Sequence, residues 1–179
     1  MALTATMYHL RIDLSDVDRG VYEKLDLRLA RHPSEAARYL FARALAYCLL
    51  YQEGLAFTRG LAASEEPALW AKTPDGRTQL WVEVGAPAAE RLHKASKAAE
   101  RVVVVTHHDP AMVKRALAGR TIHRAERIEL YALEPPLLDA LEGATGRDAL
   151  WAVVHTGGEL YVTVGAQTFH GKVSAHPLV

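Results

Sequence analysis

Apolar and polar side chains alternate with a period of two in residues 3–14 and again in residues 21–31. This is the pattern of half-buried β-strands, and the Ser, Asp and Gly residues between the two segments favour a tight turn, so an antiparallel hairpin is predicted. A wide apolar face at helical spacing then predicts a helix over residues 35–53 that packs against a sheet. Ser34 is expected to cap its first turn and Gly54 to end it.

The central part of the chain predicts a hairpin followed by a β-α-β unit. Residues 68–73 and 79–84 are apolar runs that flank an Asp-Gly pair, which is a strong hairpin signal. A helix from about 87 to 100 precedes four consecutive valines at 102–105, and an apolar run without alternation is typical of a strand covered on both faces. The crossover between the two strands is expected to be right-handed.

Turn residues divide the C-terminal part into a helix, a strand, a short helix and a hairpin. Asp109 as a cap, Pro110 in the first turn and Gly119 after the end delimit the first of these helices. A strand is expected at residues 127–133 and a short helix, ended by Gly143, at residues 135–141. A hairpin is expected to form from residues 150–155 and 159–164.

These elements predict one mixed-sheet α/β domain over residues 1–179, with a core at about 34–133 and antiparallel hairpins at 3–31 and 150–164. Its 21 Lys and Arg residues balance 21 Asp and Glu residues, so the net charge gives no general attraction to nucleic acid or membrane. The charge is uneven, however: residues 88–127 hold nine Lys or Arg and four Asp or Glu, a net charge of +5. This segment is a candidate basic surface, although a solvated helix face gives the same imbalance.

The single cysteine, Cys48, lies in an apolar helical stretch and cannot form an intramolecular disulfide, which fits a reducing compartment. The N-terminus lacks the basic and apolar regions of a signal peptide, and no run approaches the roughly 20 apolar residues of a membrane span. A cytoplasmic location without membrane attachment is therefore expected, and the sequence leaves the oligomeric state open.

The order of helix, two strands, helix and strand over residues 35–106 resembles that of metal-dependent nucleases of the PD-(D/E)xK type. In those enzymes acidic residues on neighbouring strands hold a hard divalent cation, and a lysine beside them orients water. Glu83 is the candidate acid because it interrupts an apolar strand and shares a face with Trp81 by alternation. Such a carboxylate is costly unless a metal ion or a lysine partners it, although an edge-strand glutamate that reaches water is the alternative.

The cationic partner of this site is expected on the following helix. Gly85 stands where the motif would have its lysine, and Lys94 can supply that charge, with Arg91 on the same side of the helix. Lys94 also points away from the apolar stripe, so plain solvent exposure is the alternative. Glu35 can direct a carboxylate toward the same site, or can only complement the positive end of its helix.

The chain also carries, in order, sequence blocks similar to those of YaeQ-like bacterial proteins. They are Met1-Ala2-Leu3, residues 29–35 (LARHPSE), 57–61 (FTRGL), 66–70 (EPALW) and 80–85 (LWVEVG), followed by Lys94-Ala95 and the valine strand. The resemblance covers most of the chain. It implies a variant of the restriction-endonuclease-like fold, a mixed sheet flanked by helices, in a family without a settled biochemical function.

The resemblance further implies an acidic cluster formed by Glu35, Glu66 and Glu83, with Lys94 nearby. If this site is active, the expected cofactor is Mg²⁺ or Mn²⁺, and otherwise none is expected. This sequence departs from the family at one position, where the common Glu-Pro-Asp-Leu-Trp has Ala68 in place of Asp. Because alanine cannot bind a metal, either Glu66 or the glutamate before it takes over, or the site has lost a ligand.

The first functional hypothesis is a metal-dependent nuclease or phosphodiesterase that acts on nucleic acid. In it, Glu83 and Glu66 hold Mg²⁺ or Mn²⁺. Glu35 assists, and Lys94 stabilises the charged transition state.

Two further hypotheses need no catalysis. One is a module that keeps the nuclease-type fold and binds nucleic acid or a protein through its basic segment, with Arg91, Lys94 and Lys97 as the residues expected to contact nucleic acid. The other is a regulator that contacts a protein partner through exposed aromatic side chains such as Trp70 or Trp151. Metal binding would favour the nuclease, and nucleic-acid binding in the absence of metal would favour the binding module. Binding of neither would leave the regulator that contacts a protein partner.

Overall fold

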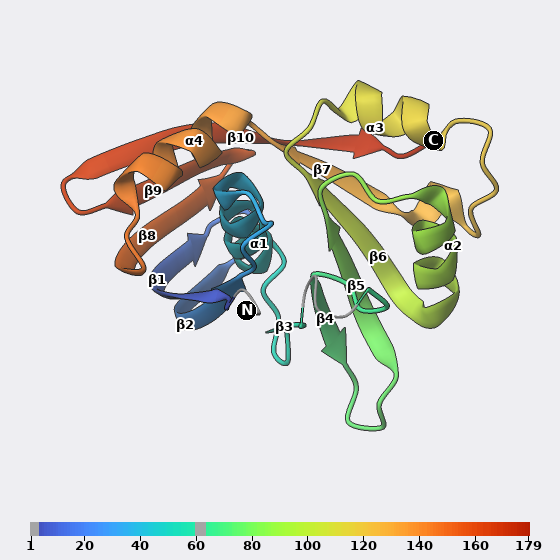
Figure 1. Cartoon of the computed structure of the whole chain (residues 1–179), viewed down its shortest axis with the longest axis horizontal. Coiled ribbons are helices and arrows are strands. Elements are labelled where there is room, and N and C mark those ends of the chain that lie inside the picture. The colour runs from blue at the N-terminus through green and yellow to red at the C-terminus, as the bar shows by residue number, and fades with distance from the viewer. Residues whose placement is uncertain (1–3, 60–63) are drawn as a thin grey trace. The chain divides into compact units, whose positions relative to one another are not determined.

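The computed structural model describes residues 4–59 and 64–179, and the chain divides into two compact units (Figure 1). Unit 1 comprises Met1–Tyr51 and Glu134–Val173, and unit 2 comprises Gln52–Leu133 and Ser174–Val179. Both units combine helices with a sheet that contains parallel and antiparallel pairs, which confirms the mixed α/β class.

The sheet of unit 1 has the strand order β2-β1-β8-β9-β10. Its strands are β1 (Thr6–Asp16), β2 (Val21–Arg31), β8 (Asp148–Thr156), β9 (Glu159–Val164) and β10 (Gln167–Pro177), the last of which ends in unit 2. Strands β1 and β8 are parallel, whereas β1–β2, β8–β9 and β9–β10 pair antiparallel. Both predicted hairpins are thus confirmed, while residue 3, where the first strand is expected to begin, lies outside the described residues.

Helices α1 (Ala37–Leu49) and α4 (Pro135–Ala144) complete unit 1. Most residues of α1 are buried, and the helix contacts β1, β2 and α4, as its wide apolar face predicts. Helix α4 extends beyond Gly143, so the prediction that this glycine ends the helix is wrong. Gly143 does not adopt a positive φ, and one glycine in a last helical turn is tolerated.

Both predicted ends of α1 are wrong. The helix is preceded by Ala36 without a side-chain cap, because the hydroxyl of Ser34 forms a 2.7 Å hydrogen bond with the ring of the nearby histidine. Gly54 comes after the helix, which already ends before Leu50. The guanidinium of Arg19 donates to the backbone carbonyls of Cys48 and Tyr51 at the C-terminal end of this helix. A distant side chain therefore satisfies carbonyl groups at the helix end, where a local glycine cap is expected.

Strand β10 is absent from the predicted elements because its polar, histidine and glycine residues show little alternation of apolar side chains. It forms by pairing with β9, from Gln167 opposite Val164 to Lys172 opposite Glu159. Its Gly171 allows α4 to pack closely, since a Cβ atom built on that glycine would lie 2.8 Å from the Cβ of Leu137.

Replacing Gly171 by alanine is expected to lower the free energy of unfolding by about 1–3 kcal/mol, because a Cβ–Cβ approach this short forces α4 away from β10. Urea denaturation followed by circular dichroism measures this change. The matched control is Gly146→Ala, where an added Cβ meets no atom within 4 Å and φ is not positive. Equal stability of the two variants would contradict the close packing of α4 on β10.

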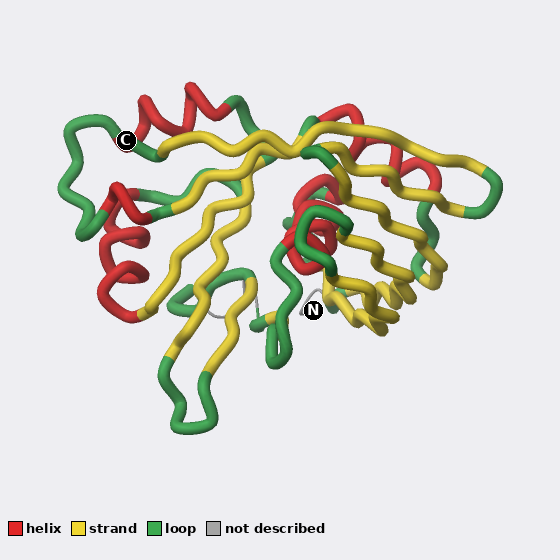
Figure 2. The backbone as a smooth tube through the Cα atoms, turned by 180° about the vertical axis from the view of Figure 1, so that it is seen from behind, coloured by secondary structure: helices red, strands yellow, loops and turns green. Residues whose placement is uncertain are grey.

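The sheet of unit 2 has the strand order β7-β6-β5-β4-β3 (Figure 2). Its strands are β3 (Ala56–Phe57), β4 (Leu69–Lys72), β5 (Thr78–Val84), β6 (Ala99–Thr106) and β7 (Glu129–Leu133). Strands β5, β6 and β7 are parallel, and β4 pairs antiparallel with β5 across a turn in which Gly76 has a φ of +88°. The predicted hairpin and the β-α-β unit are therefore confirmed.

Helices α2 (Ala89–Ala98) and α3 (Pro110–Leu117) pack on one face of the unit 2 sheet. The valines of β6 are 0–4% exposed, as expected for a strand covered on both faces. Helix α3 begins and ends as its sequence predicts, because Asp109 accepts a hydrogen bond from the N–H of Ala111 and Gly119 adopts a positive φ. None of the helices in the described part of the chain is long and apolar enough to span a membrane.

Candidate functional site

The centre of the candidate site is Glu83, which lies on β5 and is only 5% exposed. One of its carboxylate oxygens, Oε1, accepts a hydrogen bond of 2.7 Å from the indole Nε1 of Trp81. The same oxygen accepts a second bond of 2.7 Å from Nε of Arg91. The predicted shared face of Trp81 and Glu83 is confirmed, and the buried carboxylate has an arginine as its charged partner.

Arg91 is the residue around which this part of unit 2 is organised. It comes from the first turn of α2, and its guanidinium contacts the Glu83 carboxylate and the backbone carbonyls of Ser64 and Glu66. One side chain thereby joins α2, β5 and the segment that leads into β4. Since every guanidinium nitrogen donates in this arrangement, Arg91 has a structural role beyond the nucleic-acid contact predicted for it.

Two other predicted residues of unit 2, Glu66 and Lys94, are also held in ion pairs. The carboxylate of Glu66 accepts hydrogen bonds from the side chain and the N–H of Arg59, and these bonds hold its pKa below the ordinary value. Lys94 pairs with Glu65, and both side chains are exposed. Arg91 thus contacts the carboxylate of Glu83 and the backbone carbonyl of Glu66, whereas Lys94 is exposed on α2.

Glu35 belongs to unit 1 and is buried in an ion pair of 2.8 Å with Arg43 of α1. Burial raises the pKa of the Glu35 carboxyl, and the charge of Arg43 opposes that rise. Glu35 precedes the helix, and the first helical turn itself contains no acidic residue. Its carboxylate neutralises Arg43, whose guanidinium also donates to the carbonyl of Ala30.

The residues predicted to bind Mg²⁺ or Mn²⁺ do not fit such an ion. A divalent cation needs several carboxylate or carbonyl oxygens, and no group of three or more His, Cys, Asp or Glu residues in the described ranges is arranged to hold one. Each predicted acid instead has an arginine partner, and the guanidinium at Oε1 of Glu83 would repel a metal ion at that carboxylate. Ala68 is buried and offers no ligand.

A second feature of unit 2 is a hollow of about 500 Å³ at the C-terminal end of α2, which we call the basic hollow. Its walls come from the β4–β5 turn, the last turn of α2, the start of β6 and the segment before the short 3₁₀ helix Ala125–Arg127. The charged or titratable side chains that line it are Arg77, Lys97, Glu100, His123 and Arg124. Lys97 is the predicted nucleic-acid contact that lies here.

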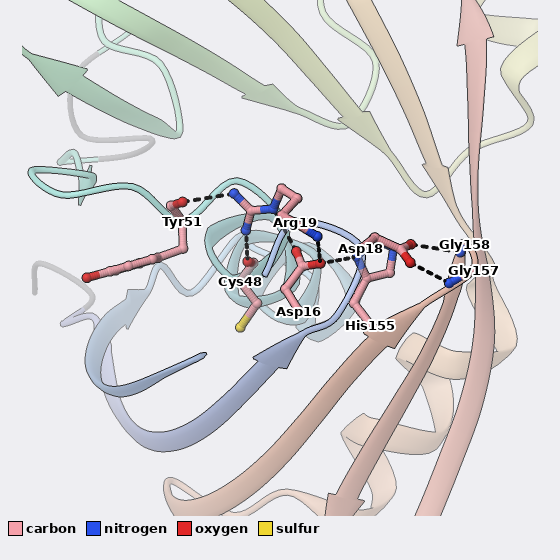
Figure 3. A network of polar contacts seen from close by, with 8 residues as sticks. All are labelled: Asp16, Asp18, Arg19, Cys48, Tyr51, His155, Gly157 and Gly158. Atoms are coloured by element: carbon pink, nitrogen blue, oxygen red, sulfur yellow. Dashed lines mark hydrogen bonds and ion pairs between the residues drawn. The ribbon is translucent and has the colours of Figure 1, made fainter. Parts of the chain in front are cut away.

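Unit 1 contains a polar network that the sequence does not predict (Figure 3). Asp16 is fully buried at the end of β1, and its carboxylate accepts hydrogen bonds from Nε and the N–H of Arg19 at 2.7 and 3.1 Å. Nδ1 of His155 lies 3.1 Å from the same carboxylate. Arg19 also donates to the carbonyls of Cys48 and Tyr51, so the network joins the β1–β2 turn, β8 and the end of α1.

Asp18 extends this network to the β8–β9 turn. Its carboxylate accepts hydrogen bonds of 2.7 and 3.2 Å from the N–H groups of Gly157 and Gly158 (Figure 3), and these bonds lower the pKa of Asp18. In the sequence, Asp16 and Asp18 are only turn residues, because their partners are about 139 residues away. Both ring nitrogens of His155 face carboxylates, Nδ1 at 3.1 Å from Asp16 and Nε2 at 3.6 Å from Asp18, so the histidine belongs to the network that joins these segments.

The aromatic residues expected to contact a partner differ in their exposure. Trp151 is 2% exposed and its indole N–H donates to the hydroxyl of Thr145, so the prediction that it is an exposed contact is wrong. Trp70 is half-buried, and Nζ of Lys72 lies 3.9 Å from its ring centroid. Trp151 is buried because it packs beside Phe41 of α1, a contact between segments far apart in the sequence.

The sequence model of the YaeQ protein family matches residues 1–173. The chain belongs to the YaeQ family. It is 39% identical over 111 residues to the uncharacterized protein YaeQ of Escherichia coli K12 and 38% identical over 111 residues to that of Salmonella typhi. These alignments span 62% of this chain and 61% of each relative.

Two crystal structures of YaeQ proteins share the fold. The YaeQ protein from Xanthomonas axonopodis pv. citri superimposes with a TM-score of 0.89 at 28% identity, over 97% of this chain and 98% of that one. The YaeQ protein from Pseudomonas syringae gives a TM-score of 0.84 at 32% identity, over 96% of this chain and 95% of that one. The YaeQ fold therefore extends over nearly the whole chain.

Proposed function

We propose that this YaeQ-family chain is a non-catalytic module that binds the phosphate groups of a nucleic acid through the basic surface of unit 2. The observation that carries the proposal is the contrast between Glu83 and the basic hollow. The carboxylate of Glu83 is already neutralised by Arg91, whereas Lys97 and Arg124 line the hollow and form no ion pair with any described residue.

The charge distribution of unit 2 supports this proposal. Nucleic-acid affinity arises largely from Lys and Arg side chains that replace the counterions around phosphate groups. The segment from residue 88 to 127, with its net charge of +5, lies wholly in unit 2 and includes α2, α3 and every wall of the basic hollow except the β4–β5 turn. Lys94 and Arg91 are held by Glu65 and Glu83, so Lys97 is the member of the predicted contact set with a charge available to a phosphate.

A nuclease ancestry is compatible with this function. The order β4, β5, α2 and β6, with β5 and β6 parallel, supports a restriction-endonuclease-like core, and we include that placement in the proposal. Cleavage would need Glu83 and Glu66 to hold Mg²⁺ or Mn²⁺, and their arginine partners favour binding without cleavage.

The proposal predicts that a labelled oligonucleotide binds in EDTA with an affinity that falls steeply from about 50 to 200 mM salt. Exchanging Lys97 and Arg124 for glutamate should weaken binding by at least about tenfold and flatten the salt dependence. Fluorescence anisotropy with single-stranded and duplex DNA and RNA measures both quantities.

The matched control exchanges Lys24 and Arg28 for glutamate. These residues are exposed on β2 of unit 1, and the double variant has the same change in net charge. It should bind nearly as well as the original protein if unit 2 carries the site. Equal weakening by both double variants, or no binding by the original protein at low salt, would contradict the proposal.

A further inference from the structure

The basic hollow has more positive charge than its acidic residues neutralise. Arg77 is shared between Asp75, with 3.0 Å from Nε to Oδ2, and Glu100, with 3.3 Å from Nη1 to Oε1. The side chains of Lys97 and Arg124 form neither a hydrogen bond nor an ion pair with any residue in the part of the chain that the structure describes. Two cations without a carboxylate partner therefore face one small space.

The convergence of these groups comes from the fold of unit 2. Thr78 at the start of β5 lies opposite Ala99 at the start of β6, which brings the β4–β5 turn beside the end of α2. His123 is fixed on the other wall, since its N–H donates to Nδ1 of His93 on α2 at 3.2 Å. The cationic side chains thus come from three segments that backbone pairing and a helix contact hold together.

Arg124 occupies an unusual backbone position in the basic hollow. Its φ of 49° and ψ of 42° are in the left-handed region, and among the described residues it is the non-glycine residue with a positive φ. Glycine would adopt this conformation without strain, whereas an arginine does so at an energetic cost. A strained residue at the wall of a binding hollow indicates that its side chain is used there.

The charge of the hollow favours one class of phosphate over another. A phosphate monoester has a charge of about −1.5 to −2 at pH 7 and three acceptor oxygens. An internal phosphodiester of a nucleic acid has one negative charge. The unpartnered side chains of Lys97 and Arg124, together with the shared Arg77, match the monoester better. The second negative charge of the monoester adds attraction to each of these cations.

We infer that the basic hollow of unit 2 binds a phosphate monoester, presented either by the phosphorylated end of a nucleic-acid strand or by a free mononucleotide. This inference rests on the proposed nucleic-acid binding and specifies the ligand group of the same surface. Lys97 and Arg124 pair with the phosphate oxygens, and Arg77 reaches them from the β4–β5 turn. Binding is the only event, and no bond of the ligand is broken.

The test compares oligonucleotides of one sequence with a 5′-phosphate, a 3′-phosphate or hydroxyl groups at both ends, each labelled internally and measured by fluorescence anisotropy in EDTA. The original protein should prefer one phosphorylated end by about fivefold. Lys97→Gln and Arg124→Gly should each weaken binding of every strand and should also remove the preference for a phosphorylated end. Arg115→Gln, which changes an exposed arginine of α3 outside the hollow, should keep the preference.

Arg124→Gly also guards against a folding defect, because glycine suits the left-handed conformation and the variant should unfold at the same or a higher temperature. If the original protein binds all three oligonucleotides equally, the inference is overturned and the proposed function still stands. If no oligonucleotide binds, the proposed function fails, and a calorimetric titration with a nucleoside 5′-monophosphate decides the inference. If the original protein binds the mononucleotide and Lys97→Gln does not, a free mononucleotide is supported as the ligand. If the original protein does not bind the mononucleotide, the inference is overturned as well.

Discussion

Replacing Asp16 by alanine is expected to lower the free energy of unfolding by about 3 kcal/mol. The carboxylate is fully buried and holds the side chain and the N–H of Arg19 and the ring of His155 (Figure 3). Without it, the guanidinium of Arg19 loses its counter-charge and the ring of His155 loses a polar partner in a largely buried setting. Arg19 would also be less well placed to donate to the carbonyls of Cys48 and Tyr51, so the end of α1 would loosen.

Urea denaturation followed by far-UV circular dichroism measures the loss of stability in Asp16→Ala. The control is Asp26→Ala, whose exposed carboxylate forms a 2.8 Å hydrogen bond with His9 and should contribute less than about 1 kcal/mol. Asp16→Asn keeps the size of the side chain but turns one acceptor into a donor, so it should recover only part of the loss. If Asp16→Ala were no less stable than Asp26→Ala, the network would not hold unit 1 together.

The second large effect is expected for Arg91→Ala, at about 2–3 kcal/mol. Glu83 would keep the indole N–H of Trp81 but would lose its counter-charge while 5% exposed. The backbone carbonyls of Ser64 and Glu66 would lose their donors as well. The value is below that for Asp16 because the Arg91 side chain is 31% exposed, which lets water replace part of the lost contact.

Adding Glu83→Gln to Arg91→Ala should restore part of the stability, because the amide is neutral and can still accept the bond from Trp81. The two single variants and the double variant form a cycle whose coupling energy measures the ion pair directly. Lys94→Ala removes the exposed pair with Glu65 and should change stability by less than about 1 kcal/mol. A coupling energy near zero would show that Arg91 does not neutralise Glu83.

Much of the fold follows from local sequence signals. The alternation of β1 and β2, the Asp-Gly turn between β4 and β5 and the consecutive valines of β6 each determine an element without reference to distant residues. The same logic places Glu83 and Trp81 on one face of β5, where the structure shows a direct hydrogen bond. These predictions succeed because strand alternation and turn chemistry act over a few residues.

The partners of charged residues are less accessible to sequence reasoning. The contact between Glu83 and Arg91 depends on how α2 crosses back over β5, and the one between Asp16 and His155 depends on the parallel pairing of β1 with β8. One local signal was available: Arg43 is a charged residue in an apolar helical segment, which indicates a buried acid nearby, and Glu35 is that acid. The C-terminal end of α1 differs from the prediction for the same reason, since the distant Arg19 donates to the carbonyl of Cys48.

The central claim is that Arg91 takes the place of a metal ion at Glu83, so that unit 2 binds phosphate groups without cleaving them. Calorimetric titration of Mn²⁺ into the original protein and into Glu83→Gln tests it most directly. We expect the two titrations to show the same heats, with no binding that depends on the Glu83 carboxylate. Stoichiometric Mn²⁺ binding that disappears in Glu83→Gln would contradict this account and would favour a metal-dependent nuclease.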